Sequence, residues 1–391
     1  MINSHDMPNA TTGRHIITFR PGLKPETMTR LLSKTAGIRA VLTSDGATAA
    51  DMGPDFGFGT AGLVFDTIGS AVVEADDDQT AALTTAAARW GGRIKSIEPE
   101  LWMRTLGYRD TAEQTWGLQA VNVRDSSRTG TGIKIAVLDT GIDPMHADIS
   151  GREWIGESFA TGEDYNDGHG HGTHCIGTAM GLGSRVGTVR YGVAPGAMIY
   201  AGKVLSSQGF GQDGWILAGI EWAIRTGVQV ISMSLGADVR RGAPHSAAYE
   251  AAAKAALDAG CLIVAAAGNA GNAPVGAPAN CPSVLAVAAV GQGLLRAPFS
   301  SIGYNDHKHP DIAAPGVDVL SSVPAHQSRT GYVAWSGTSM ATPHVAGCAA
   351  LWAEATGARG RDLWRVLVDN ARRLGGQTSE HVGAGLVQVP A

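Results

Sequence analysis

In Gly337-Thr338-Ser339-Met340-Ala341-Thr342-Pro343-His344-Val345-Ala346-Gly347, a glycine-led polar turn runs directly into small apolar residues. The apolar pattern continues to Leu351 and predicts a buried helix, with Pro343 in its first turn, where a missing N–H is tolerated. Ser339 would then stand at a helix N-terminus, where free N–H groups and the helix dipole favour negative charge. Such a serine can cap the helix, or it can attack a carbonyl group whose oxyanion is stabilised beside it.

Two further stretches favour the catalytic interpretation. The segment 133–143, IKIAVLDTGID, is an apolar run that ends in Asp139 and a glycine turn. A buried parallel strand delivers a carboxylate to the carboxyl edge of a sheet in this way. The segment 167–175, DGHGHGTHC, is glycine-rich and then helical in pattern. Asp, then His, then Ser, each on its own element, is one of the chain orders in which a serine protease triad occurs.

With these motifs the sequence resembles the subtilisin-like serine proteases, the subtilase family, from about Trp116 to the C-terminus. The matching segments are Asp139–Gly141, His171–His174, Ala267–Asn269 and Gly337–His344. The resemblance implies an α/β fold with a mainly parallel sheet and helices on both faces. It also implies a serine endopeptidase that acts on proteins or peptides and needs no cofactor for its chemistry.

The resemblance assigns four catalytic roles. Ser339 is the nucleophile, and His171 is the base that accepts its proton and later protonates the leaving amine. Asp139 holds the imidazole tautomer and stabilises the imidazolium. Asn269 donates its side-chain amide to the oxyanion, together with the backbone N–H of Ser339.

His169 and His174 lie close to His171 in the sequence and leave an alternative open. The three histidines with Cys175 could form a zinc site, since imidazole and thiolate are common zinc ligands. That interpretation gives Asp139, Asn269 and Ser339 no role. We therefore expect no catalytic metal and expect His174 to pack or form hydrogen bonds inside the protein.

The family pattern also predicts the substrate-binding residues. An extended substrate is expected to pair with the main chain of two strand edges, as in strand addition. These edges and the wall of the primary pocket comprise Ser232, Ser234, Leu235, Gly236, Gly209, Gly211, Ala267, Gly268 and Gly276. No Asp or Glu occurs between Ala265 and Ser283, so a cationic side chain would be costly to bury there. We expect a preference for large apolar residues before the scissile bond.

Composition supports a globular enzyme. The chain has 391 residues, enough for two or three domains, with 17% charged residues, 53 glycines and a net charge of −5. This charge gives no indication of a nucleic acid or an anionic membrane as partner. No apolar run approaches the length of a membrane helix, and the N-terminus shows no signal-peptide pattern, so a cytoplasmic location is expected.

The four cysteines favour free thiols. Cys175 and Cys348 fall inside helical patterns, where a small buried thiol is the simplest interpretation. Cys261 and Cys281 flank the strand that leads to Asn269. These two could pair, and the sequence does not decide it.

The chain divides into three predicted parts: residues 14–98, a linker at 99–115 and a catalytic domain at 116–391. The first part reads as a strand at 15–20, a helix at 25–36, a strand at 38–42, a strand at 63–74 interrupted by Gly69, a helix from Asp76 and a strand at 93–98. This order is that of a small ferredoxin-like α+β domain. It resembles the propeptide domain that precedes many subtilase catalytic domains.

The resemblance implies that this first part chaperones the catalytic domain and then inhibits it. The linker would enter the substrate cleft as an extended strand. Its apolar residues predict cleavage after Tyr108 or, as second choice, after Leu106. A permanently fused domain that is never cut is the alternative.

The sequence also bears on calcium binding and on the biological role. Many subtilases bind structural calcium in a loop after the histidine helix, but here residues 182–191 contain no Asn or Asp. Calcium requires six to eight oxygen ligands, so this tight site is expected to be absent, and only Asp148 keeps a plausible ligand position. The enzyme could also be a dedicated processing protease for one leader or partner protein, or a catalytically silent binding module.

Overall fold

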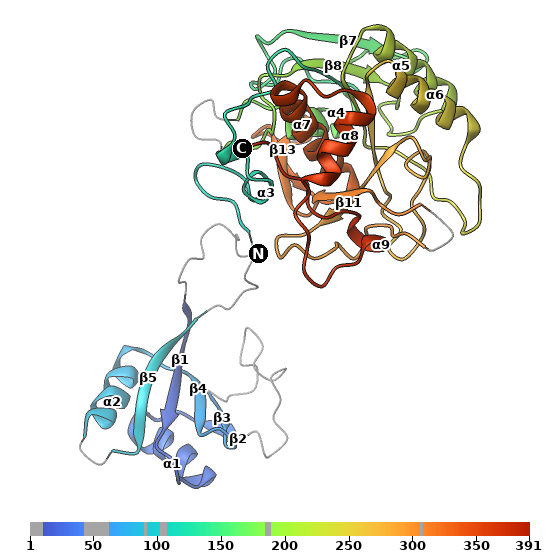
Figure 1. The fold of residues 1–391 in the computed structure, drawn as a ribbon. Helices are drawn as coiled ribbons and strands as arrows, with labels where there is room; N and C mark the ends of the chain where they lie inside the picture. Colours follow the sequence, from blue (N-terminus) through green and yellow to red (C-terminus); the bar gives the residue numbers. More distant parts are fainter. Residues whose placement is uncertain (1–10, 43–61, 90–91, 102–107, 184–188, 305–307) are drawn as a thin grey trace. The chain divides into compact units, whose positions relative to one another are not determined.

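The computed structural model describes residues 11–42, 62–89, 92–101, 108–183, 189–304 and 308–391. The chain forms two compact units, residues 1–105 and 106–391 (Figure 1). Among the helices of the described residues, none has the length and the apolar character that a membrane span needs.

The N-terminal unit is a five-stranded sheet with two helices. The strands lie in the order β2-β3-β4-β1-β5. Their bounds are β1 Thr11–Phe19, β2 Ala40–Leu42, β3 Gly62–Phe65, β4 Ser70–Glu74 and β5 Ile94–Leu101. With one helix after β1 and another after β4, the order β3-β4-β1-β5 is the predicted ferredoxin-like arrangement. Strand β2 adds an edge strand parallel to β3.

One expected strand of this unit is in fact a hairpin. Residues 63–74 were expected to form one strand interrupted by Gly69, but β3 and β4 pair antiparallel, with Phe65 opposite Ser70. Gly69 has φ of 66°, a backbone conformation that glycine adopts without a steric penalty. The glycine therefore belongs to the turn that ends one strand before the next begins.

Both helices of the N-terminal unit have clear local signals at their ends. Helix α1, Pro25–Ala36, starts with proline and ends at Gly37, which has φ of 68°. Helix α2, Asp77–Ala88, begins with a capping box in which Asp76 and Gln79 each accept the other's backbone N–H. Their buried side chains, which include Leu32 and Leu83, join the sheet in one core.

The second unit is built on seven strands in the order β12-β11-β10-β9-β6-β8-β7. Their bounds are β6 Lys134–Asp139, β7 Trp154–Ser158, β8 Met198–Lys203, β9 Val230–Met233, β10 Leu262–Ala266, β11 Leu285–Val290 and β12 Ile312–Pro315. Every neighbouring pair is parallel. The predicted parallel α/β sheet is confirmed.

Helices cover both faces of this sheet (Figure 1). Along β6, Ile135 and Val137 belong to one core, while Ala136 and Leu138 belong to the other. The first core includes residues of α4 His171–Met180, α7 Thr338–Thr356 and α8 Gly360–Asp369, and the second includes residues of α5 Asp213–Arg225 and α6 Ala247–Asp258. Strands buried on both sides explain why the sequence shows continuous apolar runs rather than alternation.

Helix α7 is the buried helix predicted from its small residues. A Cβ atom added to Gly347 would lie 2.5 Å from the Cβ of Val193, so only glycine permits the observed approach. Helix α7 also packs against α4. The two helices that carry Ser339 and His171 are therefore held in direct contact.

One strand near the C-terminus was expected, whereas several other elements have no clear sequence signal. The expected strand at 317–323 is β13, Val319–Ser322, and it pairs antiparallel with an unpredicted strand β14, Tyr332–Trp335. The edge strand β7 was also missed, because its side chains are only half-buried or exposed and form no apolar run. The remaining unpredicted helices are α3 Trp116–Ala120, the 3₁₀ helix η4 Val123–Asp125 and α9 Ser379–Val382.

All four cysteines are buried and free. Burial raises the pKa of the Cys261 thiol above its ordinary range. Burial and the nearby Glu250 carboxylate raise the pKa of Cys281 to about 11. The pairing of Cys261 with Cys281, which the sequence left open, is not formed.

Candidate active site

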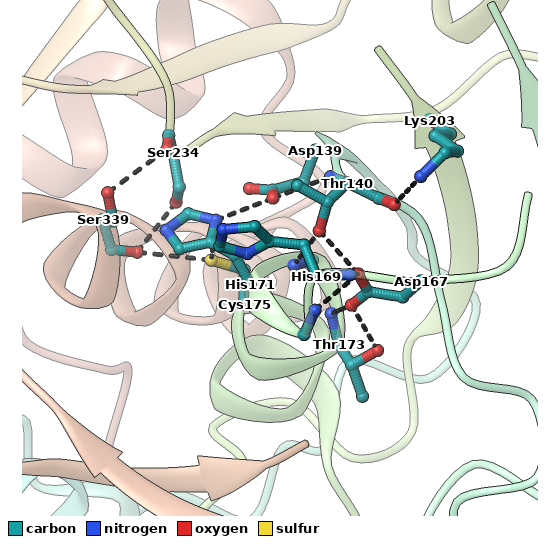
Figure 2. Close-up of polar contacts among 12 residues, drawn as sticks. Asp139, Thr140, Asp167, His169, His171, Thr173, Cys175, Lys203, Ser234 and Ser339 are labelled. Carbon is teal, nitrogen blue, oxygen red and sulfur yellow. Dashed lines mark hydrogen bonds and ion pairs between the residues drawn. The ribbon is translucent and has the colours of Figure 1, made fainter. Parts of the chain in front are cut away.

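Asp139 ends the central strand β6 at the carboxyl edge of the sheet and is fully buried. Its Oδ1 accepts the backbone N–H of Thr140 at 2.8 Å. Figure 2 shows this carboxylate directed at the ring of His171. The end of a parallel strand thus presents an acid to the adjacent helix, as the sequence predicted.

His171 is the first residue of helix α4 and follows Gly170, which has φ of 98°. Its Nδ1 lies 2.7 Å from Asp139 Oδ1. Since an ionised carboxylate only accepts, Nδ1 carries the proton that the two atoms share, and in the neutral imidazole the lone pair is on Nε2. This is the tautomer that a general base requires.

Asp167 fixes the turn that holds His171, and sequence reasoning gave this residue no role. Its carboxylate accepts five hydrogen bonds, from the backbone N–H groups of His169, Gly170 and Thr173 and from the hydroxyls of Thr140 and Thr173. Burial opposes ionisation, but these donors outweigh it and lower the pKa of Asp167. Thr140 in turn accepts the N–H of Gly172. The network ties the start of α4 to the residue that follows Asp139.

Close backbone packing brings the same two segments together. A Cβ on Gly172 would lie 2.3 Å from the carbonyl oxygen of Gly141, and Gly141 itself has φ of 114°. Neither position accepts a side chain without a shift of the backbone. The glycines of the motifs around Asp139 and His171 are therefore required by the distance between β6 and α4.

Ser339 is the second residue of helix α7. Its backbone N–H is therefore one of the four at the helix start that have no partner within the helix. The hydroxyl donates to the carbonyl oxygen of Ser234 at 3.2 Å, and the Ser234 hydroxyl donates to the carbonyl oxygen of Ser339 at 2.8 Å (Figure 2). The reciprocal pair fixes Ser339 beside the end of β9, in the same cleft as His171.

Asn269 borders the same cleft, and Thr338 orients its side chain. The Oδ1 atom accepts the backbone N–H of Thr338 at 2.9 Å and its hydroxyl at 3.0 Å. With Oδ1 held in this way, the Nδ2 group is the part of the amide left to donate. The Nδ2 group of Asn269 is therefore a donor beside Thr338, the residue that precedes Ser339.

Known families and structures match this arrangement. The model of the subtilase family matches residues 130–385. Subtilisin NAT of Bacillus subtilis subsp. natto is 42% identical over 287 residues, which are 70% of this chain and 69% of that protein. Subtilisin of Bacillus pumilus is also 42% identical over 287 residues, which are 70% of this chain and 95% of that protein.

The chain belongs to the subtilase family. It is a subtilisin-type serine endopeptidase. Among solved structures, Sphericase superposes with a TM-score of 0.62 at 33% sequence identity. The superposition covers 72% of this chain and 100% of the Sphericase chain. A cold-adapted subtilisin-like serine proteinase superposes with a TM-score of 0.59 at 30% identity, covering 68% of this chain and 92% of its own.

The charge state of the subtilase site is set mainly by Asp139. Burial alone would lower the pKa of His171, but the Asp139 carboxylate outweighs it and raises that pKa well above the ordinary value. Cys175 lies beneath the ring, with Sγ 3.9 Å from His171 Nδ1. Burial raises the pKa of this thiol, so it is neutral near pH 7 and adds no negative charge.

The other two histidines of the motif have different roles. His174 is fully buried and stacks on Trp335 at 4.8 Å, and its Nε2 faces the carbonyl oxygens of Val319 and Val333. Burial lowers its pKa to about 3, so it stays neutral, as the predicted structural histidine should. His169 lies at the cleft wall beside Gly209.

The zinc alternative required all three histidines to converge, and they do not. Among the described residues, the one group of potential metal ligands that comes together is Asp139, His171 and Cys175, whose ligand atoms lie within 4.8 Å of one another. His174 directs its Nε2 toward the β13–β14 hairpin instead. The three-histidine site is therefore wrong.

A cleft of about 570 Å³ runs along Ser339 and His171. Seven of the nine predicted substrate-binding residues border it: Gly209, Gly211, Ser234, Leu235, Gly236, Gly268 and Gly276. Two predicted edges of main chain therefore face each other across one cleft. The geometry allows an extended peptide to lie between them.

The other two predicted contact residues, Ser232 and Ala267, are not among the residues that border the cleft. Ser232 lies inside β9 and is fully buried, with strands paired on both sides. Ala267 is also fully buried, and its N–H donates to the Val287 carbonyl. Ser232 therefore supports the end of the strand from within the sheet, and Ala267 supports the pocket wall from behind.

Sequence reasoning missed cleft residues from two helices and from the segment after β9. Asp213 and Ile216 of α5, Tyr249 of α6 and Asp238 after β9 all border the cleft. They carry no local motif, and the residues of the two helices come together because α5 and α6 pack side by side. The exposed Phe210, between the predicted Gly209 and Gly211, also borders the cleft.

Two tyrosines hold one of the two carboxylate oxygens of Asp148. Its Oδ2 accepts the hydroxyls of Tyr191 and Tyr332 at 2.6 and 2.7 Å, and the nearby Arg152 compensates its charge. Burial, followed by the charge of Asp148, raises the pKa of Tyr191 well above the ordinary value, so the phenol remains a donor. Protein donors thus occupy Oδ2, whereas Oδ1 is buried without a hydrogen-bond partner among the described residues. The expectation about calcium stays a prediction.

Tyr108, the predicted processing residue, packs within the second unit. Its N–H donates to the Gln292 carbonyl at 2.9 Å, and Arg372 donates to its hydroxyl at 3.1 Å. Its ring packs beside the buried Trp116 cluster, whereas the cleft is bordered by other residues. Leu106, the second choice, lies outside the described residues.

Proposed function

We propose that Asp139, His171 and Ser339 form the catalytic triad of this endopeptidase. The observation that carries the proposal is the 2.7 Å contact between Asp139 Oδ1 and His171 Nδ1 in a cleft that Ser339 also borders. Ser339 attacks the peptide carbonyl carbon while His171 Nε2 takes its proton. His171 then gives this proton to the leaving amine, and water repeats the sequence to release the acid.

Stabilisation of the oxyanion falls to Asn269 and the start of α7. The Nδ2 group of Asn269 and the backbone N–H of Ser339 are the two donors for the negative oxygen of the tetrahedral intermediate. The hydrogen bonds from Thr338 to Asn269 Oδ1 support this role, because they keep the amide in one orientation. Donors fixed in advance need no reorganisation as the charge develops.

The primary pocket is proposed to take large apolar side chains. Its wall comes from Ala266, Gly268, Gly276, Ala277 and Pro278, which carry no charge. Small residues leave room for a large side chain, and a wall without a carboxylate offers a buried cation no compensation. Cleavage after aromatic and large aliphatic residues is the expected preference.

A sulfonyl fluoride tests the triad directly. Phenylmethylsulfonyl fluoride should abolish peptide hydrolysis and add one sulfonyl group to the peptide that contains Ser339, because only an activated serine reacts readily. A chelator should leave the hydrolysis of a short peptide unchanged. Mass spectrometry of the digested enzyme locates the label, and Ser336, exposed in the preceding turn, is the internal control. Full activity without any label on Ser339 would refute the triad.

The N-terminal unit is proposed to act as a propeptide that assists folding and then inhibits the enzyme. Its ferredoxin-like order and its position before a subtilase domain support this. A parallel sheet with many long-range contacts folds slowly, so a preformed partner can speed it. Of the two predicted bonds, cleavage after Leu106 would leave the contacts of Tyr108 with Gln292 and Arg372 intact.

N-terminal sequencing decides whether the enzyme removes this unit itself. We expect purified wild type to begin near Gly107 or Arg109, and an otherwise identical Ser339→Ala protein to keep its original N-terminus. The comparison separates self-cleavage from cleavage by a host protease, which would shorten both proteins. A wild type that stays full-length and is fully active on peptides would exclude both processing and inhibition.

A further inference from the structure

One end of the cleft combines apolar walls with a carboxylate. Asp213 and Ile216 come from the first turn of α5, and Tyr249 comes from α6. Leu205 and Leu235 border the same cleft. Of these residues, Ile216, Leu235 and Tyr249 are buried in the core beneath it, whereas Asp213 is exposed. The floor is therefore apolar, and the charge stands at the rim.

Tyr249 holds the rim carboxylate in place. Its hydroxyl donates to Asp213 Oδ1 at 2.8 Å. Burial and the neighbouring Asp213 raise the pKa of Tyr249 above the ordinary value, so the phenol stays protonated and continues to donate. A carboxylate has lone pairs on both oxygens, so this bond leaves Asp213 able to accept from a substrate as well.

Histidines apart, the charged side chains that border the cleft are all acidic. Among the described residues that border it, Asp213 and Asp238 are the acids, and none is Lys or Arg. Two arginines follow Asp238 in the sequence, but Arg241 packs over the ring of Tyr304 at 4.4 Å. Asp238 can be partly compensated by this basic segment, so the inference depends on Asp213.

An apolar floor with an acidic rim matches a long cationic side chain. Lys and Arg lay their methylene stems along apolar surface while their charged ends remain at the water interface. An aromatic or aliphatic side chain would fill the same floor but leave the carboxylate without a partner. An acidic side chain would meet the like charge of Asp213.

The distance along the cleft sets the position of this residue in the substrate. After β9 the segment that borders the cleft continues from Ser234, beside Ser339, to Asp238 four residues later, a span of at most about 13 Å if it is fully extended. A substrate strand alongside this edge covers the same distance with the same number of residues. On this spacing, the acidic rim is taken to face the fourth residue before the scissile bond.

We infer that Asp213, supported by Tyr249 and the apolar floor, selects a lysine or arginine as the fourth residue before the scissile bond. The inference rests on the proposed function, since it requires the peptide to lie in this cleft with its scissile bond at Ser339. It adds a basic determinant to the apolar preference of the primary pocket. The favoured substrates are peptides with a basic residue three positions before a large apolar one.

Matched peptides of the form acetyl-X-Ala-Ala-Phe-nitroanilide test the inference on the full chain, with X as lysine, norleucine or glutamate. Norleucine keeps the aliphatic stem and lacks the charge. For wild type we expect kcat/KM to fall from lysine to norleucine to glutamate, by about two- to fivefold per step, the range for exposed ion pairs. The preference for lysine should shrink in molar salt, because exposed charges are screened.

Two variants assign the effect to Asp213. Asp213→Asn keeps an acceptor for Tyr249 and should make lysine and norleucine equal. Asp213→Lys should reverse the order and favour glutamate. Glu221→Gln, an exposed position of α5 that is not among the cleft residues, is the matched control and should behave as wild type. If Asp213 only stabilises the start of α5, these variants change the melting temperature and leave the peptide preference unaltered.

The outcomes separate this inference from the proposed function. If none of the peptides is hydrolysed, the proposed function fails. If all are hydrolysed equally well, or if lysine is preferred only when it is moved to the second or third position before the bond, the selective role of Asp213 is refuted while the triad stands.

Discussion

Ser339→Ala is expected to hydrolyse peptides about 10⁶ times more slowly than wild type, the size of the effect being taken from the corresponding serine of subtilisin, a relative. Without the hydroxyl, no acyl-enzyme forms, and the base His171 has no proton to accept. What remains is the smaller catalysis by the oxyanion donors and by substrate binding. Turnover of a fluorogenic peptide at saturating concentration measures the loss directly.

Two controls make this result specific. Ser336→Ala removes a hydroxyl from an exposed position of the turn before α7 and should retain wild-type turnover. The melting temperature of Ser339→Ala should stay near that of wild type, since the hydroxyl makes a single hydrogen bond, to the Ser234 carbonyl. Substantial hydrolysis by a well-folded Ser339→Ala protein would show that another group is the nucleophile.

The four proposed catalytic residues could be predicted because each lies in a local motif. Asp139 follows an apolar strand, His171 follows a glycine turn, and Ser339 begins a helix of small residues. The glycines in these motifs have a physical reason. At Gly172 and Gly347 a neighbouring segment lies so close that no side chain would fit. Sequence alone can recognise such constraints.

Other features of the site depend on contacts between distant residues. The hydrogen bond from Tyr249 to Asp213 joins positions 36 residues apart, and that from Tyr332 to Asp148 joins positions 184 apart. Neither pair has a local pattern. Ser232 illustrates the opposite case, because a residue inside a family motif can lie wholly within the sheet and away from the cleft.

Both the ends and the existence of some strands were hard to predict. Gly69 was read as an interruption within one strand, although a glycine with positive φ also suits a hairpin turn. Strand β14 was missed because Tyr332–Trp335 has only half-buried and exposed side chains. Its pairing with β13 nevertheless brings Trp335 against His174. Tertiary pairing, and not local propensity, makes this segment a strand.

Asp139→Asn is expected to lower turnover by about 10⁴, a size taken from the same change in another serine protease. Asparagine can donate as well as accept, so it no longer forces the proton onto His171 Nδ1 and no longer stabilises the imidazolium. The loss should appear mainly in kcat, because Asp139 is fully buried and is not among the residues that border the cleft.

The pH dependence of the same variant tests the electrostatic cause. In wild type, the Asp139 carboxylate raises the pKa of His171, and activity is lost as falling pH protonates this base. Removing the charge lets burial dominate, so the pKa of His171 falls and the acid limb of the pH profile of kcat/KM moves to lower pH. Asp143→Asn is the matched control, because Asp143 accepts only a local backbone N–H, a role that asparagine also performs. An acid limb that stays in place in Asp139→Asn would mean that another group sets the charge of His171.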